Sequence, residues 1–285
     1  MTAVELTEDN IEEYAAFLTE DVAENVLRKG FIGYVVTDGE GKLAAGILFE
    51  ILGNLDSVTR ESSIKWIRID NREAADALFE VYDHRMQEEN VSISRFSVSR
   101  RDHPTEEEAL KEHGFATKLT EGDVINVTLE QLHAMSIIEK EGEDERIVSL
   151  SQLSVREFNK AKMKFFKMGL HGICNDLEFL PVGFFEQDIS CCIQDGMNVE
   201  GMLLLHRTPS GKLILELMAC IGKENTKLLP KMIRYSVLTA MLKYPGDMQV
   251  LIDRHNLASL LLSEYLLPEG FGILQITGER REDKI

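Results

Sequence analysis

The sequence predicts an α/β fold of the α+β kind, with two tandem domains that each contain a mixed, mostly antiparallel sheet flanked by helices. The first observation is a repeat: a strand, a short amphipathic helix and the pair Gly-Phe end at Phe115 and again at Phe271. The second is the order of elements, which runs strand, helices, antiparallel strands, helix, strand, helix, strand in each half. The third is the length of 285 residues, which suits two domains of about 140 residues.

The elements of the first half follow from the spacing of apolar residues, which differs between strands and helices. The expected strands are 3–6, 31–37, 43–52, 63–69, 91–98 and 123–129. The expected helices are 11–27, 72–89 and a short one that follows Pro104. We expect the first helix to stop at Gly30, because a glycine commonly closes a helix. The run Asp38-Gly39-Glu40-Gly41 predicts the turn of a hairpin between the second and third strands.

The second half repeats this order after an acidic segment. The expected strands are 147–150, 189–194, 199–206, 212–221, 249–253 and 273–277, and the expected helices are 155–168, 226–243 and one that opens near Asn256. The stretch 169–186 is irregular. Five acidic residues lie between positions 139 and 145, a run typical of a solvated connection. We therefore expect an N-terminal domain at 1–134, an acidic linker at 135–145 and a C-terminal domain at 146–285.

The charge of the chain limits its partners. The formal net charge is −18, which disfavours nucleic acid and anionic membranes because both are polyanions. The same field favours a basic or amine-bearing partner, although acidity also serves simply to keep a protein soluble. No apolar run approaches the ~18 residues of a transmembrane helix, and the acidic N-terminus lacks a signal segment. The sequence predicts a cytoplasmic protein with no nucleic acid or membrane partner, and it leaves the oligomeric state open.

The cysteines and histidines do not indicate a metal site. The chain has four cysteines, none of them in a Cys-x-x-Cys pair: Cys174, Cys191, Cys192 and Cys220. His171, His206 and His255 keep no metal-ligand spacing with one another or with these cysteines. The sequence therefore predicts reduced thiols in the core and no metal.

The stretch 249–271 carries the most specific pattern in the chain. A strand is followed by a helix that opens with Asn256-Leu-Ala258, carries Tyr265 and ends at Gly270-Phe271. This pattern resembles the end of the fold of the Gcn5-related N-acetyltransferases, and the shorter stretch 112–115 echoes it in the first half. The resemblance implies two tandem acetyltransferase-like domains with acetyl-CoA-dependent N-acyl transfer to a small amine or a peptide.

In this family a glycine-containing loop after the fourth strand holds the pyrophosphate of acetyl-CoA with backbone N–H groups and the start of the next helix. The resemblance assigns cofactor contacts in the second half to this loop and to one residue of the later helix: Gly222, Lys223, Asn225, Thr226, Lys227 and Asn256. Lys223 and Asn225 stand where the family has glycines, Gly222 is out of register, and Glu224 opposes a phosphate. The loop of the first half, 70–78, departs further, with Glu73 in place of a glycine. We expect the first half to be a degenerate copy that braces or covers the cleft.

Two residues are candidates for acid–base chemistry. Glu216 is the single charge in the apolar strand segment 213–219, where the family often has a general base; the alternatives are a solvated face or a pair with a basic residue. Tyr265 lies in the helix where the family often has the acid that protonates the leaving thiolate, and its alternative role is packing. Tyr265 precedes Gly270 by five residues, whereas the family spacing is four.

The preferred interpretation is an N-acyltransferase whose chemistry lies in the C-terminal half. Because both loops depart from the family pattern, a second interpretation stays open. It is a non-catalytic tandem module that has lost acetyl-CoA binding and binds a partner through the old cleft.

Overall fold

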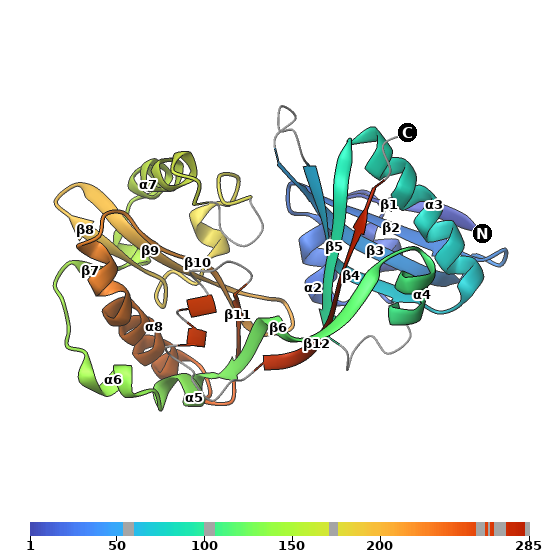
Figure 1. Cartoon of the computed structure of the whole chain (residues 1–285). Helices are drawn as coiled ribbons and strands as arrows, with labels where there is room; N and C mark the ends of the chain where they lie inside the picture. The colour runs from blue at the N-terminus through green and yellow to red at the C-terminus, as the bar shows by residue number, and fades with distance from the viewer. Residues whose placement is uncertain are drawn as a thin grey trace. The chain divides into compact units, whose positions relative to one another are not determined.

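The structure is a computed structural model that describes residues 1–53, 60–99, 106–170, 176–254, 260–261, 263–264 and 272–282. Its contacts divide the chain into two compact units (Figure 1). Unit 1 comprises Met1–Asp123 and Ile273–Ile285, and unit 2 comprises Val124–Gly272. Each unit has a mixed sheet flanked by helices, which confirms the predicted fold class.

Unit 1 contains a sheet with the strand order β1-β2-β3-β4-β5-β12-β6. The strands are β1 (Thr2–Leu6), β2 (Phe31–Thr37), β3 (Leu43–Leu52), β4 (Arg60–Ile69), β5 (Val91–Ser99), β12 (Gly272–Arg281) and the first part of β6 (Ala116–Thr128). The helices are α1 (Ile11–Tyr14), α2 (Glu20–Val26), α3 (Arg72–Glu88) and α4 (Glu106–Glu112). Strands β4 and β5 run parallel, whereas β1 to β4 pair antiparallel in turn, as do β5 and β12.

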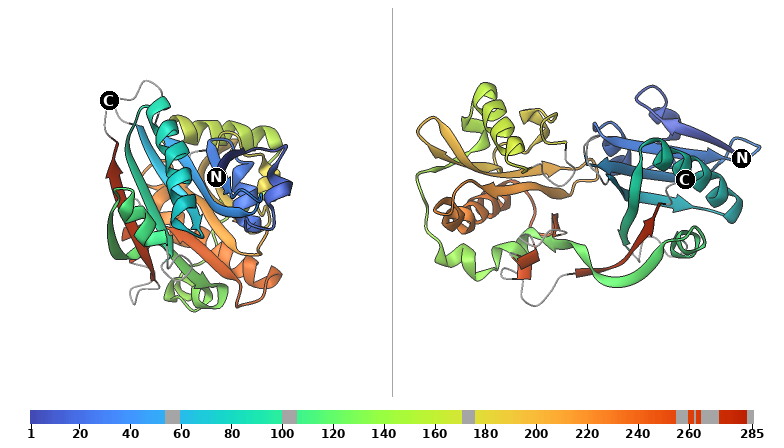
Figure 2. Two further views of the ribbon diagram at one scale, coloured as in Figure 1. Left: turned by 90° about the vertical axis from the view of Figure 1, so that its right-hand side faces the viewer. Right: turned by 45° about the horizontal axis from the view of Figure 1, so that its top comes forward.

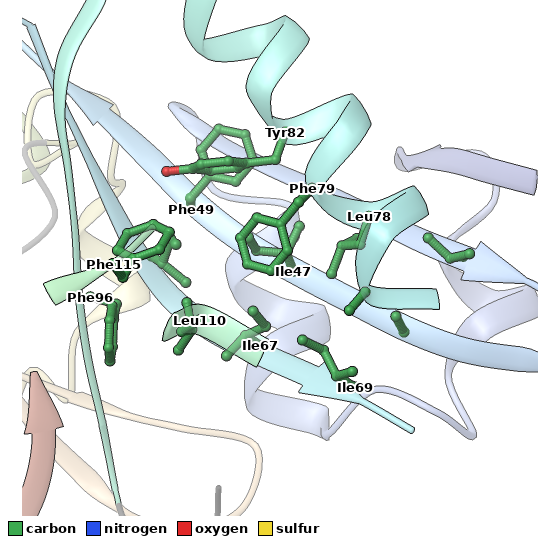
Figure 3. Packing of buried hydrophobic residues seen from close by; sticks show 14 of the residues in the cluster. Ile47, Phe49, Ile67, Ile69, Leu78, Phe79, Tyr82, Phe96, Leu110 and Phe115 are labelled. Carbon is green, nitrogen blue, oxygen red and sulfur yellow. The ribbon is translucent and has the colours of Figure 1, made fainter. Parts of the chain in front are cut away.

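The main core of unit 1 lies between the sheet and α3. Leu78, Phe79 and Tyr82 of α3 are fully buried against Ile47 and Phe49 of β3 (Figure 3). Their spacing of three and four residues puts them on one face of the helix, as the sequence pattern predicts. A smaller apolar cluster, which includes residues of α1 and α2, covers the opposite face of the sheet.

The last strand of the chain belongs to unit 1. Strand β12 pairs with β5, and its residue Arg280 is held from several sides. The guanidinium donates hydrogen bonds to the Asp83 carboxylate (2.5 Å) and to the carbonyl oxygen of His113 (3.1 Å). It also lies 4.9 Å from the centre of the Phe115 ring. Position in the sequence suggested that this strand belongs to the C-terminal domain, but its backbone hydrogen bonds complete the sheet of unit 1.

Unit 2 contains a sheet with the strand order β6-β11-β10-β9-β8-β7, to which β6 contributes its second part. The other strands are β7 (Ile147–Ser149), β8 (Cys191–Asp195), β9 (Asn198–Arg207), β10 (Leu213–Cys220) and β11 (Gln249–Asp253). The α-helices are α5 (Leu129–His133), α6 (Ser136–Lys140), α7 (Val155–Lys167) and α8 (Leu229–Lys243). Three 3-10 turns are η1 (Leu150–Gln152), η2 (Val182–Phe184) and η3 (Asn225–Leu228). Strands β10 and β11 run parallel, and the other recorded pairs of this sheet are antiparallel.

The two faces of the unit 2 sheet are covered by different helices. Helix α7 packs on one face and α8 on the other (Figures 1 and 2). Along β9 the apolar residues alternate between the faces, as the period of a strand requires. Leu203 and Leu205 pack in the cluster with α8, whereas Met202 and Leu204 pack in the cluster with α7.

Two segments differ from the sequence-based expectation. The single helix expected at 11–27 is two helices, because the Thr19 hydroxyl accepts a backbone hydrogen bond and caps α2. The acidic segment 135–145 contains α6, whose Ile137 and Ile138 are buried in the apolar cluster that includes α8. The contacts therefore divide the chain within β6, between Asp123 and Val124, and not within the acidic segment. None of the helices in the described ranges is both long and apolar enough to cross a membrane.

Candidate functional site

The parallel strands β10 and β11 of unit 2 separate soon after they begin. Their ladder ends at the pair Ile214 and Leu251, although β10 continues for several residues. The pairing of β10 with β9 shifts by one residue at Glu216, so Glu216 is the extra residue of a β-bulge. A bulge bends and twists its strand, which accounts for the loss of pairing with β11 from this point.

Glu216 is buried in the middle of an apolar strand. It is 2% exposed, and its neighbours Leu215 and Leu217 pack in the clusters on the two faces of the sheet. The structure therefore does not support the alternative in which Glu216 faces solvent. A carboxylate at this depth needs polar partners to offset the loss of water.

Strand β10 leads into a loop that is closed by its own side chains. Gly222 has a φ of +84°, a left-handed conformation that favours glycine. The Asn225 side-chain amide donates a hydrogen bond to the carbonyl oxygen of Ile221 (2.8 Å). The Thr226 hydroxyl donates one to the carbonyl oxygen of Lys223 (2.7 Å). Asn225 and Thr226 thus shape the loop, and backbone groups are what the loop offers to a ligand.

The helical segment after this loop starts without a side-chain cap. The N-cap residues of η3 and α8, Glu224 and Leu228, make no side-chain capping bond. Within the described residues, the backbone N–H groups of Gly222 and Lys223 have no hydrogen-bond partner. Lys223 and Lys227 are exposed on the same loop. Unpaired N–H groups and a helix N-terminus attract an anion, and the two lysines add positive charge.

The negative charge of the chain is concentrated in unit 1. Unit 1 has 30 acidic and 16 basic residues, a net charge of −14, whereas unit 2 has 19 acidic and 15 basic residues, a net charge of −4. The repulsion of a phosphate group that the net charge of −18 suggests is therefore weaker for unit 2 than for unit 1.

Some predicted site residues fall on positions whose structure is not described. Tyr265 and Asn256 lie outside the described residues, as do His171, Cys174 and His255. Six of the eight predicted site residues lie in the part of the chain that the structure describes: Glu216 on β10, and Gly222, Lys223, Asn225, Thr226 and Lys227 in the loop and 3-10 turn that follow it. The other two, Asn256 and Tyr265, lie on the helix that the sequence predicts after β11, and their roles stay predictions.

The described thiols are core groups. Burial raises the pKa of Cys191 and of Cys192 to about 12, and that of the half-buried Cys220 to about 11. All three are free cysteines. Within the described ranges, no group of three or more His, Cys, Asp or Glu is arranged to hold a metal ion.

Unit 1 has the same strand geometry as unit 2 with different chemistry. The ladder between β4 and β5 ends at the pair Ile64 and Phe96, and the pairing of β4 with β3 shifts by one residue at Lys65. Lys65 is therefore the bulge residue of unit 1 and forms an ion pair with Glu50 (2.8 Å). The general-base position predicted for the family holds a lysine in unit 1 and Glu216 in unit 2.

The anion-binding features of the unit 2 loop are absent from the matching place in unit 1. Asn71 caps α3 by accepting a hydrogen bond from the backbone N–H of Ala74 (2.9 Å). The carboxylate of Glu106, which is 5% exposed, accepts a hydrogen bond from the backbone N–H of Ile69 at the end of β4 (3.4 Å). A phosphate placed there would meet a buried carboxylate and a helix start that is already capped.

A buried histidine on the α7 face of unit 2 was not predicted as a site residue. His206 of β9 is 4% exposed, and its ring stacks on Phe184 with 3.8 Å between ring centres. Its Nδ1 lies 2.9 Å from the carbonyl oxygen of Phe184. In the sequence His206 is simply a histidine at the end of an apolar strand. Its place beside the bulge becomes visible only when the two halves are aligned by their bulges.

The comparisons with known proteins identify the fold. No family model matches the sequence, and no curated protein matches it. Among solved structures, a tandem GNAT protein from the clavulanic acid biosynthesis pathway, without AcCoA, aligns with a TM-score of 0.63 and 9% identity over 100% of this chain and 99% of that chain. A GCN5-related N-acetyltransferase from Kribbella flavida aligns with a TM-score of 0.56 and 10% identity over 96% of both chains.

A third similar structure is the glucosamine N-acetyltransferase region of a fungal multi-domain GH3 β-N-acetylglucosaminidase. It aligns with a TM-score of 0.60 and 10% identity, and this chain, aligned over 98% of its length, spans only 38% of that chain. At such identities the likeness concerns the fold alone. The protein has the fold of the Gcn5-related N-acetyltransferases in tandem, as the resemblance in its sequence implied.

Proposed function

We propose that the protein is an N-acyltransferase that uses acetyl-CoA, with the chemistry carried by unit 2. The observation that supports this most is the contrast between the two bulges and the loops that follow them. Unit 2 combines a buried carboxylate at the bulge with an uncapped helix start, whereas unit 1 has a lysine, a capped helix and a buried carboxylate at the end of β4.

The loop after β10 would hold the phosphate groups of acetyl-CoA. The backbone N–H groups of Gly222 and Lys223 and the start of η3 would donate hydrogen bonds, and Lys223 and Lys227 would add charge. Asn225 and Thr226 would keep the loop in shape through their bonds to backbone carbonyl oxygens. Asn256 would contribute from the helix that the sequence predicts after β11.

The reaction needs a proton acceptor for the amine and a proton donor for the leaving sulfur. Acetyl-CoA would supply the acetyl group as a thioester. Glu216 would accept the proton that the attacking amine loses, and its place at the separation of β10 and β11 suits this role. Tyr265 would give a proton to the thiolate released when the carbon–sulfur bond breaks.

The acyl acceptor would be a small amine or a peptide amine. Unit 2, which would carry the site, has a net charge of −4, and this sign favours the approach of a cationic acceptor. A direct screen of amines decides between a small molecule and a peptide as the acceptor.

Calorimetric titration of the purified protein with acetyl-CoA tests this proposal. We expect micromolar binding that weakens as salt rises, because the phosphate contacts are ionic. Lys223→Glu should weaken binding by about tenfold or more, since it replaces a favourable charge by an opposing one. Lys212→Glu is the matched control, because Lys212 precedes β10 and Lys223 follows it. Absence of binding at millimolar acetyl-CoA would retire the proposal.

A further inference from the structure

The bulges of the two units allow a residue-by-residue comparison of their central strands. In unit 1, Phe49 of β3 pairs with Ile64, and the register of the ladder then shifts by one residue at Lys65 of β4. Pairing resumes between Leu48 and Trp66.

Unit 2 repeats this arrangement. Leu205 of β9 pairs with Leu215, the register shifts by one residue at Glu216, and the next pair is Leu204 with Leu217. Glu216 therefore takes the place of Lys65, and Leu205 takes the place of Phe49. The two residues that pair just after the bulge, Leu204 and Leu217, both pack in the cluster that contains α7.

The residue after Phe49 is Glu50, and the residue after Leu205 is His206. The Lys65 ammonium lies 2.8 Å from the Glu50 carboxylate, whose side chain is 4% exposed. Unit 1 thus places an ion pair across the bulge, between its extra residue and the neighbouring strand. In unit 2 the same two positions hold Glu216 and His206, which are 2% and 4% exposed. Both units therefore have one acidic and one basic residue at these positions, with the order of the charges reversed.

The hydrogen bond of His206 to the backbone fixes the orientation of its ring. A carbonyl oxygen can only accept, so Nδ1 of His206 must carry a proton and donate to Phe184. The stack on the Phe184 ring holds the plane of the imidazole. Nε2 is then the ring atom that serves a second interaction. A histidine whose one ring nitrogen is held by a backbone carbonyl can use the other ring nitrogen to bind a carboxylate.

We propose that His206 contacts the Glu216 carboxylate through Nε2 and positions it as the proton acceptor of unit 2, a role that rests on the proposed function. His206 is a positioning residue, because it acts through Glu216 and not on the acceptor itself. The Nε2–H group orients the buried carboxylate, as the Lys65 ammonium faces the Glu50 carboxylate in unit 1. When Glu216 takes up a proton from the amine, the pair changes its charge but keeps its hydrogen bond.

Other charged groups lie on the elements that pack near His206 on this face. Helix α7 contributes Lys162, which binds the carbonyl oxygen of Leu180, and Lys164, which is paired with Glu200. The segment before η2 contributes Asp176 and Glu178. The test therefore has to change Glu216 alone and follow His206.

Titration of the His206 ring by NMR in the full-length protein provides this test. In the wild type we expect the midpoint of His206 to lie at least one pH unit above that in Glu216→Gln, because an opposite charge at contact distance favours the imidazolium. His133, an exposed histidine of α5, serves as the reference and should not move. An unchanged midpoint of His206 in Glu216→Gln would overturn the proposal.

A second experiment places the residues of the unit 1 ion pair at the matching positions of unit 2. Its outcome can be read even if the Glu216→Gln variant does not fold. His206→Glu and Glu216→Lys should each lower the midpoint of thermal unfolding by roughly 6–20 °C, since each breaks a buried pair. The double variant recreates the Glu50–Lys65 pair and should recover at least half of the summed loss. Losses that simply add would refute the contact. If the double variant recovers stability but acetyl-CoA does not bind, the proposed function is refuted and the contact between His206 and Glu216 is supported.

Discussion

Replacement of Arg280 by alanine should destabilise unit 1, although Arg280 lies only five residues from the end of the chain. The side chain is 12% exposed and joins β12 to α3 through Asp83 and to the residue after α4 through the His113 carbonyl. It also binds the Glu282 carboxylate (2.9 Å). Alanine removes all of these interactions and leaves Glu282, 14% exposed, without its cation.

The expected loss is about 3 kcal/mol. A hydrogen bond to a charged group contributes roughly 1.5–3 kcal/mol, and the contact with the Phe115 ring roughly 0.5–2 kcal/mol. The share of Asp83 is discounted, because its side chain is 43% exposed and solvent screens the pair. For a unit of this size, 3 kcal/mol corresponds to a decrease of roughly 10 °C in the unfolding midpoint.

Trp66 provides the assay, because it is the single tryptophan of the chain and lies in unit 1. Its fluorescence during urea or thermal unfolding reports the stability of unit 1. Arg281→Ala is the matched control, since Arg281 is the next residue of β12, carries the same charge and is exposed. Equal midpoints for Arg280→Ala and Arg281→Ala would refute the reasoning and show that β12 is not anchored through Arg280.

Two further predictions concern packing and pH. Gly278→Ala should destabilise unit 1 by about 1–3 kcal/mol in the same assay, because its Cβ would lie 2.5 Å from the Phe96 ring. Gly39→Ala, also in unit 1 and with no atom within 4 Å of the added Cβ, is the control, and equal stabilities of the two variants would contradict the prediction. The Arg146 side chain lowers the pKa of Asp144 from 3.8 to about 2 by a hydrogen bond. Ionised Asp144 therefore stabilises the fold above pH 3.8, and this contribution is lost as the pH falls toward 2. Asp144→Asn should reduce the acid sensitivity seen by circular dichroism between these values, and an unchanged profile would exclude this role.

The candidate site was proposed from the sequence. An isolated charge in an apolar strand pointed to Glu216, and the loop after that strand was recognised by its place before a helix. The role of single residues was harder to see. Asn225 was predicted to bind cofactor because it stands at a glycine position, whereas its amide bonds to the carbonyl oxygen of Ile221. Such a bond depends on the shape that the loop takes, and residue type alone does not specify that shape.

That the first half is a degenerate copy stays a prediction. Glu73 in the loop suggested it. The structure adds the buried carboxylate of Glu106 at the end of β4 and the capping of α3 by Asn71. Glu106 is far from Ile69 in the sequence, and only packing of α4 brings them together.

The sequence by itself determined the class of fold, the order of the strands along the chain and the placement of a carboxylate on the fourth strand of the second half. These features follow from local rules, because the spacing of apolar residues and the chemistry of turns act over a few residues. Tertiary structure alone decided that β12 completes the sheet of unit 1, that a bulge falls at Lys65 and at Glu216, and that His206 takes the place of Glu50. Each of these depends on hydrogen bonds and burial between segments distant in the chain, for which the pattern of one segment carries no information.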